Sequence, residues 1–232
     1  GGAFDITVGP LVTAWGFGPR RLPPEPPPEE ELAELLPHVG FRLLELTDEG
    51  VVKKDPRTQG DLSAIAKGYA VDQVAETLEA EGFDDYMVEV GGEVRTGGHA
   101  PGGGPWRIGI EGPTPEGHTL YRVLPLSNLA VATSGDYRNF YEVNGRRYSH
   151  TLDPKTGRPV EHAGAAVSVV MEDCASADGW ATALLVLGPD AGYDLATEKE
   201  LAALFQSHEE GGGISVRQTP RFEALFGPAP PR

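Results

Sequence analysis

The stretch that decides the fold runs from Ala165 to Leu187 and reads AAVSVVMEDCASADGWATALLVL. Its first part, Ala165–Met171, is a continuous run of small and apolar residues, which is typical of a central strand covered on both faces. Its later part, Ser176–Leu187, predicts a buried helix. Gly188-Pro189 marks the end of that helix, because glycine favours a helix C-terminus and proline cannot continue it. The stretch therefore predicts a central strand and a packed helix.

Around this stretch, strand signals outnumber helix signals. The strongest hairpin signal is Asn144-Gly145, because both residues tolerate the left-handed backbone of a two-residue turn. A second helix is predicted from residues at helical spacing that end before Gly82, namely Val71, Val74, Ala75 and Leu78. Other predicted strands are Phe41–Leu46, Val51–Lys54, Tyr86–Val90, Trp106–Glu111, Leu120–Leu124, Ala130–Thr133, Ala202–Ser207 and Gly213–Arg217. Because strands do not alternate regularly with helices, the pattern favours an α+β fold over a doubly wound sheet.

The composition limits the partners of the chain. With 232 residues and 39% hydrophobic residues, the chain can bury the core of one domain. Its formal net charge is −16, from 35 acidic and 19 basic residues. Such a surface repels the phosphates of nucleic acid, so no nucleic-acid partner is expected. A small phosphorylated substrate would need a cation or a local cluster of donors to offset the same repulsion, which favours a metal.

Cysteine content and hydropathy exclude several other classes. The single cysteine, Cys174, excludes an internal disulfide and a cysteine-based zinc site, and its neighbours indicate a small buried residue. No stretch approaches the roughly 18 consecutive apolar residues of a membrane helix. No signal peptide is visible, because residue 1 already lies in globular sequence.

Asp178 and Thr182 are the first candidate site residues. Four residues apart on a helix, they share one face. A carboxylate and a hydroxyl in this arrangement are hard oxygen ligands that suit Mg²⁺. Such pairs are also common without any metal, with the acid near a helix N-terminus and the threonine bonded to a backbone carbonyl, so the spacing alone leaves both interpretations open.

The second candidate is the segment Gly60–Asp72, which reads GDLSAIAKGYAVD. Its small residues let the backbone approach a ligand closely, and Lys67 offers a point charge for a phosphate or for a nearby acid. The alternative is a tight loop that Asp61 caps, with Lys67 in solvent.

Three other segments offer polar or aromatic groups. His150 follows a predicted strand and could move a proton at neutral pH. Ser134 and Gly135 end another strand in a hydroxyl-rich loop that could donate to phosphate or ribityl oxygens. Phe4 could pack against a flavin ring, although core packing is the default for an aromatic residue. Five histidines are expected at the surface: His38, His99, His118, His162 and His208.

Five segments, taken in order along the chain, resemble the ApbE family, the FAD:protein FMN transferases. They are Ala-Phe-Asp…Val-Gly-Pro-Leu from Ala3 with Trp15-Gly16-Phe17-Gly18, Asp-Leu-Ser…Lys-Gly-Tyr-Ala from Asp61, Thr-Ser-Gly-Asp-Tyr from Thr133, Ser-His…Asp-Pro…Thr-Gly from Ser149, and Ala-Asp-Gly-Trp…Thr-Ala…Leu-Gly-Pro from Ala177. The resemblance runs from Gly2 to the C-terminal region. It implies a T-fold-like α+β domain over residues 1–232, with a mostly antiparallel sheet and packed helices, that binds FAD and Mg²⁺.

The resemblance also implies roles for individual residues. Asp178 and Thr182 match the family's side-chain metal ligands, and Ala64 matches a ligand position at which only its carbonyl can serve. The positions that match flavin-nucleotide contacts are Ala3, Phe4, Asp5, Asp61, Lys67 and Leu152. Some members carry a further acidic ligand at the position of Ala181, and some carry glutamate in place of Lys67.

The implied activity is Mg²⁺-dependent transfer of the FMN half of FAD to a threonine or serine hydroxyl of an acceptor protein, with release of AMP. His150 and Asp178 are the expected catalytic residues, and the acceptor is expected to be a separate protein, for example a subunit of a membrane redox complex. Two alternatives remain: hydrolysis of FAD to FMN and AMP, and binding of FAD without turnover.

The family's N-terminal portion, which carries a secretion or lipoprotein signal and further FAD contacts, is expected to be missing from this chain. The resemblance implies a periplasmic or membrane-tethered location.

Overall fold

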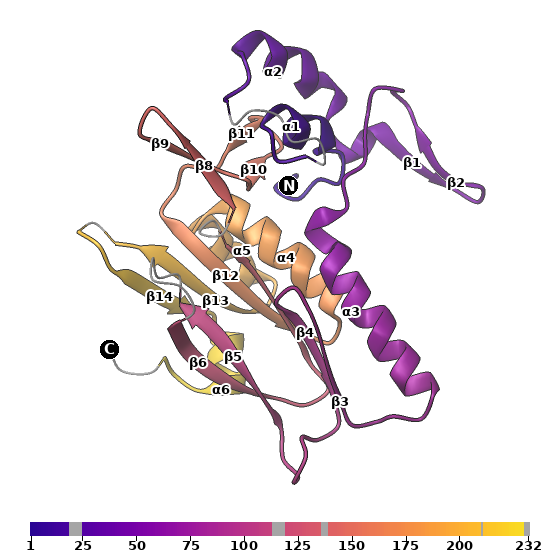
Figure 1. Cartoon of the computed structure of the whole chain (residues 1–232), viewed down its shortest axis with the longest axis vertical. Coiled ribbons are helices and arrows are strands. Elements are labelled where there is room, and N and C mark those ends of the chain that lie inside the picture. Colours follow the sequence, from indigo (N-terminus) through magenta and orange to yellow (C-terminus); the bar gives the residue numbers. More distant parts are fainter. Residues whose placement is uncertain (19–24, 113–118, 136–138, 210, 230–232) are drawn as a thin grey trace. The chain divides into compact units, whose positions relative to one another are not determined.

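The structure is a computed structural model of the whole chain and describes residues 1–18, 25–112, 119–135, 139–209 and 211–229. The chain divides into two compact units (Figure 1). Unit 1 comprises Gly1–Leu62 and Arg138–Glu161, and unit 2 comprises Ser63–Tyr137 and His162–Arg232. The assignment of the whole chain to a single domain stays a prediction.

A six-stranded sheet forms the centre of unit 2. Its order is β14-β13-β12-β7-β4-β3, and every neighbouring pair is antiparallel. The strands are β3 (Tyr86–Val90), β4 (Glu93–Gly97), β7 (Ala130–Gly135), β12 (Gly164–Met171), β13 (Ala202–His208) and β14 (Ile214–Gln218). The predicted central strand is β12, which has two partners on one side and three on the other. The α+β class with a mostly antiparallel sheet is confirmed.

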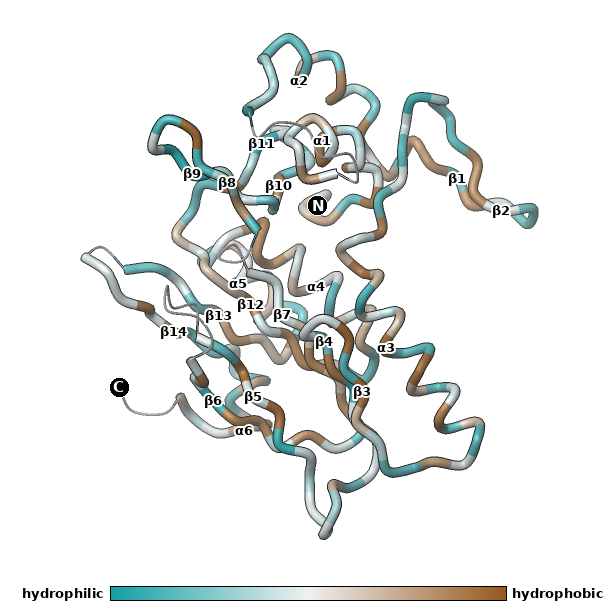
Figure 2. The backbone as a smooth tube through the Cα atoms, viewed as in Figure 1, coloured by the Kyte–Doolittle hydropathy of each residue, from teal (hydrophilic) through white to brown (hydrophobic). Residues whose placement is uncertain are grey.

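Helices cover one face of this sheet. They are α3 (Ser63–Ala80), α4 (Cys174–Leu187) and α5 (Ala191–Glu198), as Figure 1 shows. Because side chains alternate along a strand, Val167 and Val169 of β12 point to this face and pack against Leu184 and Leu185 of α4. The strands in the middle of the sheet are largely apolar (Figure 2). This packing holds α4 against the middle of the sheet.

The opposite face of the sheet packs against a hairpin and a short helix. The hairpin consists of β5 (Trp106–Gly112) and β6 (Thr119–Leu126), and the helix is α6 (Pro220–Phe226). Residues that alternate with the helix-facing set, such as Val170 and Leu204, share a core with Leu124 and Phe222. The sheet is thus buried on both faces, which explains the unbroken apolar run of β12.

Unit 1 consists of short elements. The helices are α1 (Gly9–Ala14) and α2 (Glu29–Leu35), and two 3₁₀ turns follow at Leu36–His38 and Phe41–Leu43. Three hairpins complete the unit: β1 (Leu44–Thr47) with β2 (Gly50–Lys53), β8 (Phe140–Val143) with β9 (Arg146–Ser149), and β10 (Leu152–Asp153) with β11 (Arg158–Pro159). Trp15 joins the two chain segments of the unit, because its Nε1–H donates to the carbonyl of Gly157 at 2.7 Å.

Most predicted elements are present, with a few corrections. Asn144 and Gly145 have φ angles of 53° and 76°, as the predicted hairpin turn requires. The predicted apolar face of α3 is wrong at Val74, because that residue is 47% exposed. His38 is buried and pairs with Asp55, so its surface placement is also wrong. His118 lies outside the described residues. The predicted strand Phe41–Leu46 is wrong at its start, because Phe41–Leu43 forms a 3₁₀ turn. The sequence did not predict α1, α5, β4, β10 or β11.

Among the described residues, no helix is both long and apolar enough to span a membrane.

Candidate functional site

The candidate metal ligands of unit 2 lie where α3 meets α4, and Gly68 makes this contact possible. A Cβ atom at Gly68 would lie 2.4 Å from the carbonyl oxygen of Cys174 and 2.8 Å from Cα of Ala175. Real Cβ atoms are not found so close to backbone, so a residue without a side chain is required here. The glycine brings the first turns of α3 against the start of α4.

Asp72 of α3 fixes the N-terminus of α4. Its carboxylate accepts hydrogen bonds from the N–H groups of Cys174, at 2.9 and 3.0 Å, and of Ala175, at 2.8 Å. The first N–H groups of a helix have no partner within it, and a negative charge there also interacts favourably with the helix dipole. Arg95 of β4 donates to the same carboxylate at 2.9 Å. The two helices are therefore held in a defined register.

Asp178 faces α3 from α4. Its side chain is 2% exposed, and Oδ2 accepts a hydrogen bond from the N–H of Gly68 at 3.1 Å. Burial raises the pKa of Asp178, while the Gly68 N–H and the Lys67 ammonium lower it. Because an ionised carboxylate loses hydration when it is buried, a cation at this position would offset part of that cost.

Two further predicted oxygen ligands lie near Asp178. Thr182 is one helical turn along α4, and its Oγ1 is 3.0 Å from Oγ of Ser134 on β7. In a regular helix the carbonyl of Ala64 accepts from the N–H of Gly68, the same group that approaches Asp178. Two oxygens that approach one N–H are separated by at most about 6 Å. Unit 2 thus brings Ala64, Ser134, Asp178 and Thr182 together, with Gly135 next to Ser134. The predicted loop at Ser134 and Gly135 is wrong, because both residues belong to β7 and pair with β12.

These oxygen atoms are suitable ligands for a hard cation. Within the described part of the chain, no group of three or more histidine, cysteine, aspartate or glutamate residues could hold a metal. The set at the α3–α4 contact instead combines one carboxylate with neutral hydroxyl and carbonyl oxygens. Mg²⁺ is commonly bound through one or two carboxylates, and it keeps several waters and substrate phosphate oxygens. The residues present therefore fit Mg²⁺ with an incomplete protein shell.

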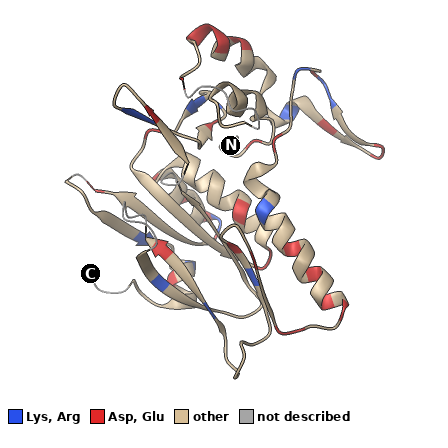
Figure 3. Cartoon of the chain, in the orientation of Figure 1, with Lys and Arg blue, Asp and Glu red and all other residues tan. Residues whose placement is uncertain are grey.

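The sequence interpretation missed Glu93, the first residue of β4. Its side chain is 1% exposed and forms an ion pair with Lys67. Burial raises the pKa of Glu93, the Lys67 ammonium lowers it, and the negative charge of Asp178 raises it. Lys67 is the one basic residue of α3, which otherwise carries acids (Figure 3). Lys67 is therefore paired with a buried acid, while its own side chain remains 43% exposed.

In unit 1, the opening segment and the Asp61 loop lie together. The N–H of Asp61 donates to the carbonyl of Ile6 at 2.7 Å. Asp5 is buried, and its carboxylate accepts from the N–H and hydroxyl of Thr7, at 2.9 and 2.6 Å, and from the N–H of Phe41, at 2.8 Å. Asp5 thus fixes the backbone of this segment. Ala3 is buried, and Phe4 is half-buried.

His150 and Leu152 also belong to unit 1. The ring nitrogen Nδ1 of His150 lies 2.9 Å from the carbonyl oxygen of Asn139. A carbonyl can only accept, so in the neutral ring Nδ1 carries the proton and Nε2 carries the lone pair of a base. Leu152 is 6% exposed, and its side chain packs in the core with Leu11 and Trp15. The flavin contacts expected of Ala3, Phe4, Asp5, Asp61 and Leu152 stay predictions.

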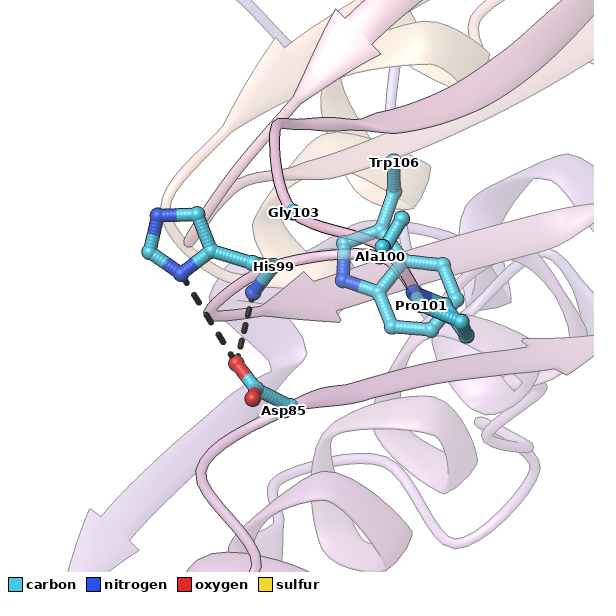
Figure 4. Close-up of a pocket in the computed structure, with 7 residues that line it drawn as sticks. Asp85, His99, Ala100, Pro101, Gly103 and Trp106 are labelled. Atoms are coloured by element: carbon cyan, nitrogen blue, oxygen red, sulfur yellow. Dashed lines mark hydrogen bonds and ion pairs between the residues drawn. The ribbon is translucent and has the colours of Figure 1, made fainter.

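A separate hollow of about 380 Å³ in unit 2 contains none of the predicted site residues. Figure 4 shows its lining, which includes Asp85, His99 and Trp106. The backbone N–H of His99 donates to Oδ1 of Asp85 at 2.7 Å, and the Trp106 indole N–H donates to the carbonyl of Gly97 at 2.8 Å. These bonds hold the turn after β4. The hollow is therefore a consequence of how this turn folds.

The sequence of the chain is similar to sequences of known proteins. Residues 1–205 match the model of the ApbE family. The chain is 43% identical over 203 residues to the FAD:protein FMN transferase of Vibrio cholerae, covering 88% of this chain and 61% of the relative. It is 37% identical over 229 residues to the enzyme of that name from Escherichia coli K12, covering 97% and 65%. The chain thus spans under two thirds of the length of these curated relatives.

The chain is also similar to solved structures. The apo flavinyl transferase ApbE of Pseudomonas stutzeri superimposes with a TM-score of 0.88 and 42% identity, covering 97% of this chain and 70% of that chain. The flavin transferase ApbE of Vibrio cholerae gives a TM-score of 0.87 and 39% identity, covering 96% and 70%. Together with the family match over residues 1–205, these likenesses show that the chain belongs to the ApbE family.

Proposed function

We propose that this chain transfers the FMN half of FAD to a threonine or serine hydroxyl of an acceptor protein, in a reaction that requires Mg²⁺ and releases AMP. The names of the relatives support FAD as the substrate and a protein as the acceptor. The observation that carries the proposal is the buried carboxylate of Asp178, with the hydroxyl of Thr182 and the carbonyl of Ala64 close to it.

Asp178, Thr182 and the carbonyl of Ala64 would hold the metal. When bound, Mg²⁺ would offset the negative charge of the FAD diphosphate and stabilise the charge that develops on it during transfer. This compensation matters in a chain whose formal net charge is −16.

The protein's own residues would bind FAD and orient it. In unit 2, the Lys67 ammonium and the Ser134 hydroxyl can contact phosphate oxygens, and Gly135 lets the backbone approach them. In unit 1, the Ala3–Asp5 segment, Asp61 and Leu152 are the proposed contacts of the flavin nucleotide. The bonds of Asp5 to Thr7 and Phe41 support a preformed loop, which lowers the entropy cost of binding.

The proposed transfer is a displacement at the FMN-side phosphorus. The acceptor hydroxyl oxygen forms the new bond to that phosphorus, and the bond between the phosphorus and the bridging oxygen breaks. AMP leaves with the bridging oxygen and its electron pair. His150 Nε2 accepts the proton of the hydroxyl, and the bond from Nδ1 to the Asn139 carbonyl holds the ring in the required tautomer.

The test is incubation of the chain with FAD, Mg²⁺ and a threonine-containing acceptor peptide, with mass spectrometry of the peptide and chromatography of AMP. We expect a mass gain of one FMN group, loss of the reaction in excess chelator, and loss in Asp178→Asn. Asp190→Asn is the matched control, because it also removes one carboxylate, on a 92% exposed side chain that pairs with Arg217.

Other outcomes would identify the alternatives. Free FMN and AMP in equal amounts, with no adduct on any acceptor, would replace transfer by hydrolysis. If the chain binds FAD stoichiometrically, keeps it in the presence of Mg²⁺ and releases no AMP, it binds FAD without turnover.

The family resemblance also supports the proposal that the protein acts outside the cytoplasm. Fractionation of the native host with an antibody to this chain tests the proposal, and recovery in the cytoplasmic fraction would contradict it.

A further inference from the structure

Three ion pairs join α3 to β4. Lys67 pairs with Glu93, and Arg95 pairs with Asp72 at 2.9 Å and with Glu79 at 3.3 Å. The two strand residues are two positions apart, and Lys67 and Asp72 on the helix are five apart, which corresponds to about 6.7 Å along a strand and about 7.5 Å along a helix. Because the spacing of Glu93 and Arg95 nearly matches that of Lys67 and Asp72, Glu93 meets Lys67 where Arg95 meets Asp72. These two pairs therefore form a matched set.

The Lys67–Glu93 pair differs from the Arg95–Asp72 pair because the carboxylate of Glu93 accepts fewer hydrogen bonds than that of Asp72. Glu93 is 1% exposed, and within the described residues its Oε2 has no hydrogen-bond partner. Asp72, by contrast, also accepts from the N–H groups of Cys174 and Ala175. A buried carboxylate with few donors depends on its ion pair, so Glu93 holds the Lys67 ammonium strongly.

Gly91 contributes to this arrangement. A Cβ atom at Gly91 would lie 3.1 Å from Cδ of Lys67 and 3.8 Å from Oε2 of Glu93. The bare backbone of the turn between β3 and β4 therefore lies over both side chains and limits where the lysine stem can go.

Lys67 also acts on Asp178. Its ammonium lowers the pKa of that buried carboxyl, and the next residue, Gly68, donates its N–H to Asp178. The Lys67 ammonium thus acts on the charge of Asp178 while it is paired with Glu93. An ammonium in direct contact with Asp178 would compete with any cation there, because both bind the same oxygens.

We propose that Glu93 is a positioning residue for the metal site: by holding the Lys67 ammonium, it keeps that ammonium off Asp178 and leaves the carboxylate available to a divalent cation. This inference rests on the proposed function, since it assumes that a metal binds at Asp178. Loss of the Glu93 charge has two effects of the same sign. Lys67 is released toward Asp178, and a negative charge near the metal disappears.

The experiment measures Mn²⁺ affinity by electron paramagnetic resonance, with the metal alone and no FAD, in four forms of the chain: wild type, Glu93→Gln, Lys67→Met and the double variant. We expect Glu93→Gln to weaken Mn²⁺ binding about tenfold, the order that one unit charge near a divalent ion produces in a partly buried site. Lys67→Met should bind Mn²⁺ more tightly than wild type. The double variant removes both charges and should return to within about threefold of wild type.

Lys67→Met distinguishes positioning from a structural role. If Glu93 only supported the fold, loss of its partner Lys67 would leave a buried charge unpaired and would not tighten Mn²⁺ binding. Asp190→Asn controls for the loss of one negative charge, and thermal unfolding of each variant reports its folding.

FMN transfer by wild type, measured in parallel, tests the proposed function separately. A wild type that transfers FMN while the double variant binds Mn²⁺ no better than Glu93→Gln overturns the role of Glu93 alone. A wild type that binds no Mn²⁺ overturns the inference together with the metal site. The expected Mn²⁺ pattern in a chain that transfers no FMN supports the role of Glu93 and removes the transferase proposal.

Discussion

Gly68→Ala tests whether the contact between α3 and α4 builds the candidate site. The new Cβ would lie 2.4 Å from the carbonyl oxygen of Cys174, whereas ordinary contact begins at 3.4 Å. The helices must therefore separate by about 1 Å, the difference between these two distances. The same shift lengthens the 3.1 Å bond from the Gly68 N–H to Asp178 to about 4 Å, beyond hydrogen-bonding distance.

The expected change in the free energy of unfolding of Gly68→Ala is the sum of two opposing effects. Overpacking costs about 3 kcal/mol at the upper end of its usual range, which a clash with backbone warrants. Alanine is favoured over glycine within a helix by about 1 kcal/mol, so the net loss in the free energy of unfolding is about 2 kcal/mol. For a chain of this size, that loss lowers Tm by about 4–8 °C. A displacement of about 1 Å at the site should slow FMN transfer about a hundredfold.

The assays are thermal unfolding by circular dichroism and AMP release under saturating FAD and Mg²⁺. Gly192→Ala is the matched control, because its Cβ would lie 2.6 Å from the carbonyl oxygen of Leu184, where α5 packs on α4. This control should lose stability like Gly68→Ala while the folded fraction keeps its turnover rate. Wild-type Tm and turnover in Gly68→Ala would refute the proposed contact, and equal loss of turnover in both variants would show that it reflects stability alone.

Three other variants probe single groups. Asp178→Asn should abolish Mg²⁺-dependent AMP release without lowering the Tm of the metal-free protein, because burial already disfavours the charge of Asp178; unchanged AMP release would contradict the metal assignment. His150→Ala should slow transfer far more than it raises the dissociation constant for FAD, measured by fluorescence titration, and equal losses would make His150 a binding residue. Asp55→Asn should unfold at lower urea than wild type at pH 7. The Arg57 N–H and His38 lower the pKa of Asp55 below its usual 3.8, so its stabilisation is present above that pH and is lost as pH falls through the folded-state pKa. Urea midpoints that differ equally at pH 7 and at pH 2 would contradict this assignment.

The sequence predicted those elements whose signals are local. Asn144-Gly145 lies in the expected turn because its backbone angles are a property of the two residues themselves. The strand Ala165–Met171 and the helix Ser176–Leu187 are predictable because each is apolar along most of its length and ends at a clear break. In the structure they begin slightly earlier, at Gly164 and Cys174. Asp178 and Thr182 share a helix face for the same reason, since helical periodicity alone places them there.

Other features depend on contacts between segments distant in sequence. The buried face of α3 includes Gly68 and Asp72, which a hydrophobic pattern does not count, so the predicted stripe was displaced onto the exposed Val74. The helix Ala191–Glu198 was missed because Gly192 suggests a break, although this glycine is required where α5 approaches Leu184.

Glu93 gave no local sign of burial, because its partner Lys67 is 26 residues away. The one usable signal was the opposite charge order of Lys67 and Asp72 against Glu93 and Arg95. It becomes readable only after the helix and the strand are known to be neighbours.

Cys174 gives the chain an internal reporter. Its thiol is fully buried at the start of α4, and burial together with the neighbouring carboxylates raises its pKa, so a thiol reagent reacts only after α4 parts from α3. Because Cys174 is the single cysteine, the rate at which an unlabelled chain is alkylated under native conditions counts the openings of that one contact. The alkylation rate thus reports how often the start of α4 opens, without any engineered label.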